Sequence, residues 1–331
     1  MNFALVYLGE KVPEYVFRNL AYLTATFPEE SVYFVSDSEA ALDKAGGVGV
    51  KTFKSETSAT LNQILNQNLT HPKNFRGNFW LHTTSRFFAL MELSNHIHEP
   101  LIHIEADVFL LPTFPASSFL PITKLAFPLE SKVTGAASIF YIPNPESIAH
   151  FVTFILESTA QNGSETDMTL LGKYWTLNPE RVEILPSLPE GLASAKENSA
   201  IRAASANLRS FKGLFDPLSY GMYLLGADPS NNYARTIFGE KPQAHLISSL
   251  PLKFEQRKNS LFLVFEEAAY EIFCLHVHSK NIRIFDLQRY NNEIAKGIIC
   301  AEKLTKKISI KIFFKLLRKW LVARLRGRDN V

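Results

Sequence analysis

The sequence predicts a mixed α/β fold with a mostly parallel sheet that is flanked by helices. The first observation comes from the opening residues, where an apolar run at 3–8, a helix-like segment at 12–27 and a second apolar run at 31–37 follow one another. A strand, a helix and a strand in this order imply a parallel pair joined by a right-handed crossover. The second observation is that strand-like and helix-like segments keep alternating farther along the chain.

The spacing of the apolar residues indicates the type of each element. Val16, Leu20 and Leu23 recur at three- and four-residue intervals, which is the period of one helix face. Residues 79–97 form a second predicted helix, which leads into a predicted strand at 101–111. The other predicted elements are a strand at 135–144, a helix at 147–159 and a long loop or loose helix pair at 186–210.

The composition is typical of a soluble globular protein. With 46% hydrophobic and 20% charged residues, the 331-residue chain can bury a large core in one big α/β domain or two smaller ones. A net charge of +3 does not predict binding of polyanions by the chain as a whole. Cys274 and Cys300 lie in apolar stretches, which indicates reduced thiols and a cytosolic location. We expect neither a signal peptide nor a membrane-spanning segment.

Two acids interrupt the predicted strand at 101–111. Alternate side chains of an extended segment point the same way, so Glu105 and Asp107 are expected to project together. Two carboxylates at one spot repel each other unless a positive charge lies between them, and Mg²⁺ or Mn²⁺ can supply it. The alternative is that one acid caps a helix and the other pairs with an Arg or Lys. A position at the carboxyl end of a strand favours the metal.

These acids and several other segments resemble the GT-A glycosyltransferases. HIEADV (103–108) is similar to the acidic metal-binding motif of that family, and it follows a helix that carries Arg86. The resemblance covers roughly residues 3–285 and implies a GT-A-like fold. One departure is Glu105, because many members have Asp at this position. The other matching segments are GAASIFYIPN (135–144), TDMTLLGKYW (166–175), LFDPLSYGMYLLGADPSN (214–231) and LHVHSKNIRIF (275–285).

The resemblance implies a metal-ligand set with Mn²⁺ or Mg²⁺ as the cofactor. Asp107 would bind the ion directly, and Glu105 would assist. His276 and His278 share one face of a predicted strand, and His278 is the favoured ligand because it lies nearest the polar turn. Lys280 would then contact phosphate. The alternative for this stretch is a packed polar pair followed by a solvated lysine.

The resemblance also implies residues that contact the donor. Tyr7, Gly9 and Asp37 lie at the ends of the first two predicted strands, where the base and ribose would bind. Each of the three is equally compatible with an ordinary turn. Arg86 would reach the carboxylates or the phosphates. Its alternative is a helix-surface ion pair, which contributes less than about 1 kcal/mol.

Two further aspartates are candidates for the catalytic base or for contact with the donor sugar. Asp167 starts a predicted helix, so its alternative role is to cap that helix. Asp216 precedes Pro217 in a turn-rich segment and is the rival candidate for the general base. The sequence does not rank the two.

The C-terminal segment has a different composition. From Lys303 to Arg328 there are ten basic residues and no acid, with Trp320 and aliphatic residues between them. On a helix the basic and apolar residues fall on opposite sides, which is typical of a helix that lies in a membrane interface. The alternatives are a helix docked on the catalytic domain and a nucleic-acid-binding tail. The apolar face argues against nucleic acid.

Together these features predict a GT-A-like catalytic domain at 1–290 and a basic amphipathic tail at 291–331. The expected activity is metal-dependent transfer of a hexosyl or related group from a nucleotide-sugar, foremost a UDP-sugar, to a hydroxyl of a saccharide or lipid-linked acceptor. Surface glycan or glycolipid synthesis, on the cytoplasmic face of an anionic membrane, would suit such an enzyme. The alternative is a membrane-docked scaffold without turnover. A sugar nucleotidyltransferase is disfavoured because no Gly-rich, Arg-containing loop follows the first strand.

Overall fold

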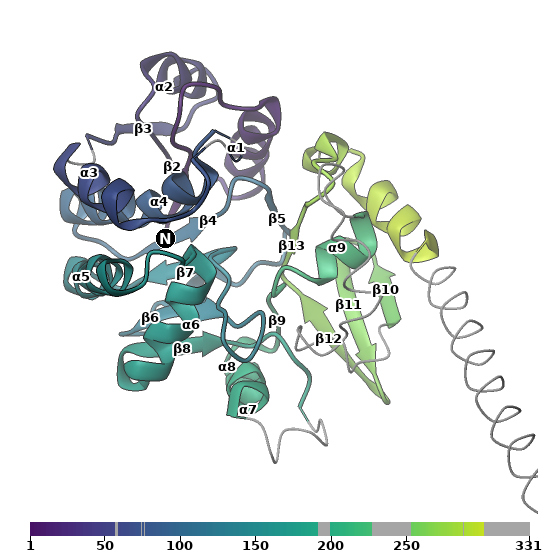
Figure 1. The fold of residues 1–331 in the computed structure, drawn as a ribbon. Helices are drawn as coiled ribbons and strands as arrows, with labels where there is room; N and C mark the ends of the chain where they lie inside the picture. Colours follow the sequence, from purple (N-terminus) through teal and green to yellow (C-terminus); the bar gives the residue numbers. More distant parts are fainter. Residues whose placement is uncertain are drawn as a thin grey trace, which may run out of the picture.

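The fold is known from a computed structural model. It describes residues 1–56, 59–73, 75, 77–190, 199–226, 253–286 and 288–300. Figure 1 shows one large sheet with its helices and, beside it, a smaller lobe of strands that the chain forms later.

The large sheet has seven strands. Every neighbouring pair in it is parallel except the two pairs that include β7. This confirms the predicted mixed, mostly parallel sheet. In order across the sheet, the strands are β3 (Lys51–Lys54), β2 (Ser31–Ser36), β1 (Asn2–Val6), β4 (Leu101–Ile104), β7 (Ile139–Ile142), β6 (Leu125–Pro128) and β8 (Val182–Leu185).

Helices cover this sheet, and their apolar faces explain why they form where they do. In the first helix, Val16, Leu20 and Leu23 are all fully buried, as their spacing predicts. Burial of a Leu or Val side chain contributes roughly 1.5–3 kcal/mol, so this face anchors the helix. The helices around the sheet are α1 (Glu14–Thr26), α2 (Glu39–Gly46), α3 (Ala59–Asn68), α4 (Phe79–Ile97), α5 (Pro145–Gln161) and α6 (Asp167–Leu177), with a 3₁₀ turn η2 at Pro179–Arg181.

A two-stranded sheet joins the large sheet to the smaller lobe. β5 (Val108–Leu110) pairs antiparallel with β13 (Cys274–His276), and Val108 lies opposite His276. A late segment of the chain therefore meets the residues that directly follow β4 (Figure 1). A 3₁₀ turn, η1 (Ala116–Phe119), follows β5.

The smaller lobe contains a four-stranded sheet and short helices. β11 pairs antiparallel with β10 and β12, and β9 pairs parallel with β12. The predicted loose helix pair at 186–210 corresponds in part to α7 and α8. Besides α9 (Tyr220–Leu225), the lobe contains β9 (Gly213–Leu214), β10 (Lys253–Arg257), β11 (Ser260–Phe265) and β12 (Ala268–Ile272). α7 (Ser199–Ala206) packs on β8 of the large sheet, α8 (Leu208–Phe211) leads into β9, and η5 (Ile282–Phe285) contacts α1.

The last described segment is a helix at 290–300 that packs onto the smaller lobe. Ile294 is 1% exposed, and a Cβ added at Gly297 would lie 2.4 Å from the carbonyl oxygen of Leu224 in α9. Residues 291–300 therefore pack with the body of the protein, although the sequence assigned them to the tail. The basic segment 301–331 lies outside the described residues. No described helix is both long enough and apolar enough to cross a bilayer.

Candidate metal centre

Glu105 and Asp107 lie in a tight turn between β4 and β5. The sequence predicted one strand over 101–111, but β4 ends at Ile104 and the Val108 N–H donates to the carbonyl of Glu105 at 2.9 Å. Asn19 of α1 fixes the turn, because its side-chain amide donates to the carbonyls of Ala106 at 3.0 Å and Val108 at 2.9 Å. The two acids thus approach each other through a braced turn rather than through strand alternation.

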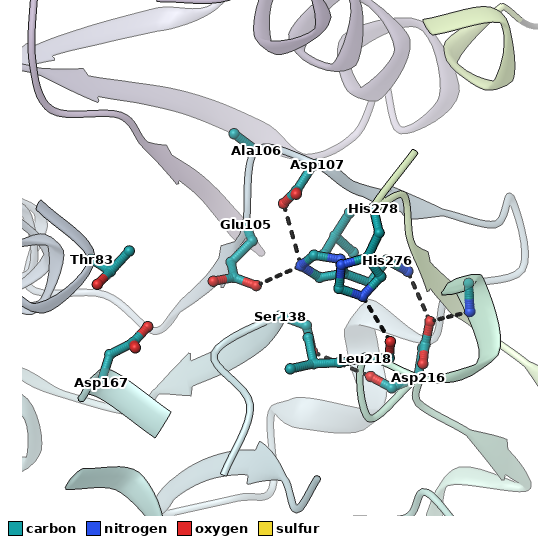
Figure 2. Close-up of polar contacts among 12 residues, drawn as sticks. Thr83, Glu105, Ala106, Asp107, Ser138, Asp167, Asp216, Leu218, His276 and His278 are labelled. Carbon is teal, nitrogen blue, oxygen red and sulfur yellow. Dashed lines mark hydrogen bonds and ion pairs between the residues drawn. The ribbon is translucent and has the colours of Figure 1, made fainter. Parts of the chain in front are cut away.

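His276 completes a three-residue cluster with these acids. Its Nε2 lies 3.1 Å from Oε2 of Glu105 and 3.4 Å from Oδ1 of Asp107 (Figure 2). The ligand atoms of the three residues all lie within 4.8 Å of one another. Antiparallel pairing of β13 with β5 brings this histidine to the turn, some 170 residues away in sequence.

The favoured histidine of the sequence prediction, His278, is not the one that faces the acids. Its Nε2 lies 2.8 Å from the carbonyl oxygen of Leu218, and its ring packs against the ring of His276 with centroids 4.0 Å apart. Burial, followed by the neighbouring His276, lowers the pKa of His278 to about 3. His278 is therefore a neutral packing partner, and the prediction that it is the first metal-ligand candidate is corrected to His276.

Buried charges of both signs surround the cluster. Burial alone would raise the pKa of Glu105, but Arg86 and His276 together hold it well below its ordinary value. Burial also opposes ionisation of Asp107, yet His276 and Lys280 lower the pKa of this carboxyl. Burial would lower the pKa of His276, but Asp107 and Glu105 raise it. The cluster is thus two carboxylates whose charge is balanced by neighbouring cations.

Arg86 links the cluster to α6. It is 8% exposed and forms ion pairs with both Glu105 and Asp167, while its Nε donates to the carbonyl of Thr83 at 2.7 Å. The alternative of a helix-surface ion pair is therefore wrong. Asp167 is the first residue of α6, but Thr166 caps the helix, so Asp167 is free to face Arg86. Burial raises the pKa of Asp167, although Arg86 opposes this effect.

Lys280 forms an ion pair with Asp107, whereas Arg86 pairs with Glu105. The Lys280 side chain is 34% exposed, and its Nζ lies 5.2 Å from the centroid of the Tyr15 ring. The sequence predicted that Lys280 contacts phosphate, whereas its partner here is a carboxylate. The alternative from the sequence was that one acid caps a helix and the other pairs with an Arg or Lys, and in the structure both acids pair with a cation, Glu105 with Arg86 and Asp107 with Lys280.

Asp216, the second candidate base, is fully buried. Its Oδ1 accepts the Tyr220 N–H at 2.8 Å, and its Oδ2 accepts the N–H groups of Gly221 at 2.7 Å and His276 at 2.8 Å. Burial raises the pKa of this carboxyl, and the three backbone donors act in the opposite direction. A general base must reach the proton it removes, so this environment indicates a structural role.

The predicted nucleoside contacts, Tyr7, Gly9 and Asp37, follow β1 and β2 and lie at the carboxyl ends of the parallel strands, as the cluster does. Gly9 has a φ of +107°, which favours glycine, and its N–H donates to Oδ1 of Asp37 at 2.8 Å. Tyr7 is partly buried, and burial followed by the charge of Asp107 raises its pKa. Asp37 borders a cleft of about 340 Å³ that is lined by Leu8, Asp37, Ser55, Glu56, Asn62, Leu81, His82 and Ser85.

Most residues of this cleft were missed by sequence reasoning. Asn62 comes from α3, and Leu81, His82 and Ser85 come from α4, so the cleft depends on how these two helices pack. One signal was available: His82 lies four residues before Arg86, and this spacing puts both on one face of a helix.

The cluster has the donor chemistry of a divalent metal site. Carboxylate oxygens suit Mg²⁺ and Mn²⁺, and an added imidazole nitrogen is compatible with Mn²⁺. The Nε2 atom of His276 faces both carboxylates, so this nitrogen is the one placed to join them at an ion. Glu105, Asp107 and His276 therefore fit a metal, with Asp107 and Glu105 as hard anionic ligands.

Comparisons with known proteins give structural similarities only. No protein family and no curated protein matches the sequence. Among solved structures, the chain is similar to mouse xyloside xylosyltransferase 1, with 11% identity, a TM-score of 0.39 and coverage of 62% of this chain and 93% of the other. It is similar to the PaToxG glycosyltransferase, with 12% identity, a TM-score of 0.38 and coverage of 54% and 69%. It is also similar to an active-site mutant of LgtC, with 11% identity, a TM-score of 0.38 and coverage of 62% and 84%.

Proposed function

We propose that this protein is a metal-dependent glycosyltransferase that moves a sugar from a nucleotide-sugar to a hydroxyl acceptor. The observation that carries the proposal is the convergence of Glu105, Asp107 and His276 at one edge of a mostly parallel sheet. Asp37, which follows β2, borders a cleft at that edge, and ligands of open α/β sheets gather at the carboxyl ends of the strands. The motif order along the chain supports the same enzyme class.

The three clustered residues would hold the metal. When bound, Mn²⁺ or Mg²⁺ would supply Lewis-acid stabilisation of the negative charge that develops on the leaving diphosphate. Arg86 keeps Glu105 ionised and oriented, because its guanidinium pairs with that carboxylate from a buried position. Lys280 pairs with Asp107 and is more exposed than Arg86, so its ammonium is available to turn towards a phosphate. Preorganised positive charge of this kind is commonly the largest catalytic contribution.

Asp167 is a better candidate than Asp216 for a direct role in sugar transfer. It lies beside Arg86, within the same buried charge network as Glu105, whereas both oxygens of Asp216 are bound by backbone N–H groups. We infer that Asp167 contacts the donor sugar or the acceptor hydroxyl. Its ion pair with Arg86 would orient the carboxylate for either role.

The donor, acceptor and location remain proposals that rest on the sequence. We propose a UDP-sugar donor, a saccharide or lipid-linked acceptor, and peripheral attachment to the cytoplasmic face of an anionic membrane through residues 301–331. Ten basic residues between 303 and 328 support this attachment. Truncation before Ala301 should then move the protein from sedimented anionic liposomes into the supernatant. Unchanged sedimentation would contradict the membrane proposal.

Nucleotide release tests the proposed activity. The purified full-length protein is incubated with a panel of nucleotide-sugars, in Mn²⁺, in Mg²⁺ and in EDTA, and free nucleoside diphosphate is measured. We expect release that requires the metal and that is lost in Asp107→Ala. Asp43→Ala, which removes an exposed carboxylate from α2, is the matched control and should release at the wild-type rate. Nucleotide-sugar binding without release and without metal dependence would favour the scaffold.

A further inference from the structure

Asp216 has a fully buried carboxyl group, and the groups that accommodate it there need an explanation. Its side chain is fully buried, and a buried carboxylate is costly unless it is hydrogen-bonded or paired. Its oxygens accept three backbone N–H groups at 2.7–2.8 Å, two from the start of α9 and one from His276. Charge-assisted bonds of this type are stronger than neutral ones, so the three residues are held firmly to one carboxylate.

The hydrogen bond from the His276 N–H to Asp216 takes the place of a bond to a neighbouring strand. β13 pairs with β5 along one edge, and the His276 N–H on its other edge points to Oδ2 of Asp216. On the β5 side, the Val277 N–H donates to the carbonyl of Asp107 at 2.7 Å. The backbone at His276 is therefore fixed from both sides, and one of the two sides is a single carboxylate.

Close packing strengthens this connection. A Cβ added at Gly221 would lie 2.1 Å from the carbonyl oxygen of His276 and 2.7 Å from its nitrogen. Only glycine leaves room for α9 to approach β13 so closely. The carboxylate of Asp216 thus binds both sides of a tight backbone contact, the start of α9 and the end of β13.

A chain of hydrogen bonds continues from Asp216 to Glu105. The Ser138 hydroxyl donates to the carbonyl of Asp216 at 3.3 Å, and the Glu105 N–H donates to the carbonyl of Ser138 at 3.1 Å. His276 Nε2 then faces Glu105, which closes the ring (Figure 2). Through this ring, His276 and Glu105 of the cluster are both connected to the buried Asp216.

We propose that Asp216 is a positioning residue that holds the His276 imidazole at the carboxylates, so that the cluster binds a divalent cation with three side chains rather than two. The inference rests on the proposed function, because it assigns Asp216 a part in the same metal centre. Groups that orient a metal ligand from behind typically contribute 10–100-fold to metal affinity. Asp216 differs from the usual case because it orients the ligand through the main chain.

Mn²⁺ affinity tests the inference without any measurement of turnover. Free Mn²⁺ is followed by electron paramagnetic resonance during titration of the full-length protein and of Asp107→Ala, Asp216→Asn, His276→Ala and the double variant of Asp216 and His276. In Asp216→Asn an amide NH₂ replaces one acceptor oxygen, and we expect Mn²⁺ to bind about tenfold more weakly. In the His276→Ala background, Asp216→Asn should not weaken Mn²⁺ binding further, because a residue that acts only through His276 has no effect once His276 is removed.

Two variants separate positioning from general destabilisation. Tyr220→Phe removes a buried hydroxyl of α9 that donates to the carbonyl of Ser187 at 2.6 Å, and it should leave Mn²⁺ affinity unchanged. Ser138→Ala breaks the ring but leaves the carboxylate in place. If Asp216→Asn does not fold, Ser138→Ala replaces it in the same cycle, with a smaller loss of affinity expected.

The possible outcomes are distinct. An equal loss of affinity from Asp216→Asn in both backgrounds, or no loss in either, would overturn the positioning role. If His276→Ala weakens Mn²⁺ binding and Asp216→Asn does not, the metal centre stands and only this inference fails. If neither Asp107→Ala nor His276→Ala changes Mn²⁺ binding, the metal centre itself is wrong and the inference fails with it.

Discussion

Carboxylates that are partly or fully buried are neutralised in two different ways in two adjacent regions of this protein. At the turn after β4, Glu105 and Asp107 are balanced by the side-chain cations of Arg86 and Lys280 and by an imidazole. At the junction of α9 and β13, Asp216 is balanced by backbone N–H groups. Side-chain cations can turn away when a ligand arrives, but backbone donors cannot move unless the local structure opens. The first region is therefore suited to exchange partners, and the second to hold the first in place.

Removal of Arg86 should give the largest effect on stability. Arg86→Met leaves the partly buried Glu105 and the buried Asp167 without their shared guanidinium, and breaking a buried pair in this way costs about 3–5 kcal/mol. The free energy of unfolding in urea measures the loss. Mn²⁺ should raise the unfolding midpoint of this variant more than that of the wild type, because a bound cation compensates the negative charge that the missing guanidinium leaves unpaired.

An exposed arginine provides the control for this change. Arg18 pairs with Glu14 on the surface of α1, with 59% of its side chain exposed, so Arg18→Met should change stability by only about 0.5 kcal/mol. A similar loss in the two variants would mean that Arg86 does not compensate buried charge. Equal Mn²⁺ stabilisation of Arg86→Met and the wild type would contradict the idea that the first region exchanges its cations.

Asp216→Asn should give the next largest loss. Hydrogen bonds to a charged group contribute about 1.5–3 kcal/mol, and the amide cannot accept all three backbone donors that the carboxylate accepts. We expect the free energy of unfolding to fall by about 2 kcal/mol. Here Mn²⁺ should raise the midpoint less than in the wild type, which is opposite to Arg86→Met. If Mn²⁺ stabilises both variants to the same extent, the distinction between the two regions is lost.

The two regions also differ in how far the sequence predicts them. Glu105 and Asp107 are conspicuous because acids in an apolar segment need compensation, and this signal is local. The choice between His276 and His278 is not local. Both lie on one face of an extended segment, and the carbonyl of Leu218, which contacts His278, comes from a separate turn. The two-residue period of a strand therefore identifies His276 and His278 as candidates, but it does not show which of them contacts the acids.

The role of Asp216 is hidden for a stronger physical reason. Its partners are backbone N–H groups, one of them 60 positions away in sequence. Almost every residue type has such a group, so the sequence does not indicate which ones bind Asp216. The fold shows the same limit. The strand, helix and strand at the start were predicted from local periodicity, whereas the antiparallel strands β10, β11 and β12 were not. Their place in the structure depends on pairing with each other and with the distant β9.

The stability of the first region should depend on pH through His103, a buried residue of β4. Burial, followed by the charge of Arg86, lowers the pKa of His103 to about 3 from an ordinary 6.5. Below pH 6.5 the unfolded chain therefore binds a proton that the folded chain does not, so stability is lost as the pH falls. Between pH 7 and pH 5 this loss amounts to about 2 kcal/mol.

Unfolding in urea at several pH values measures this effect. His103→Gln can keep the contact with the carbonyl of Ala4 but has no titrating group, so its stability should fall less steeply between pH 7 and pH 5 than that of the wild type. The difference between the two profiles isolates His103 from other titrating residues. Parallel profiles would mean that the pKa of His103 is the same in the folded and unfolded protein, so that burial does not lower it.

Lys280 should give the smallest change in stability and the most direct sign of exchange. Its side chain is 34% exposed, so the ion pair with Asp107 is screened by solvent, and Lys280→Ala should change the free energy of unfolding by less than about 1 kcal/mol. Because this ammonium competes with a metal for the same carboxylate, Mn²⁺ should bind more tightly to the variant when no nucleotide is present. The exposed Lys296, which pairs with Glu293, gives a control in which Lys296→Ala leaves Mn²⁺ affinity unchanged. Weaker Mn²⁺ binding in Lys280→Ala would show that the lysine supports the centre and does not compete for it, and the first region would then be as fixed as the second.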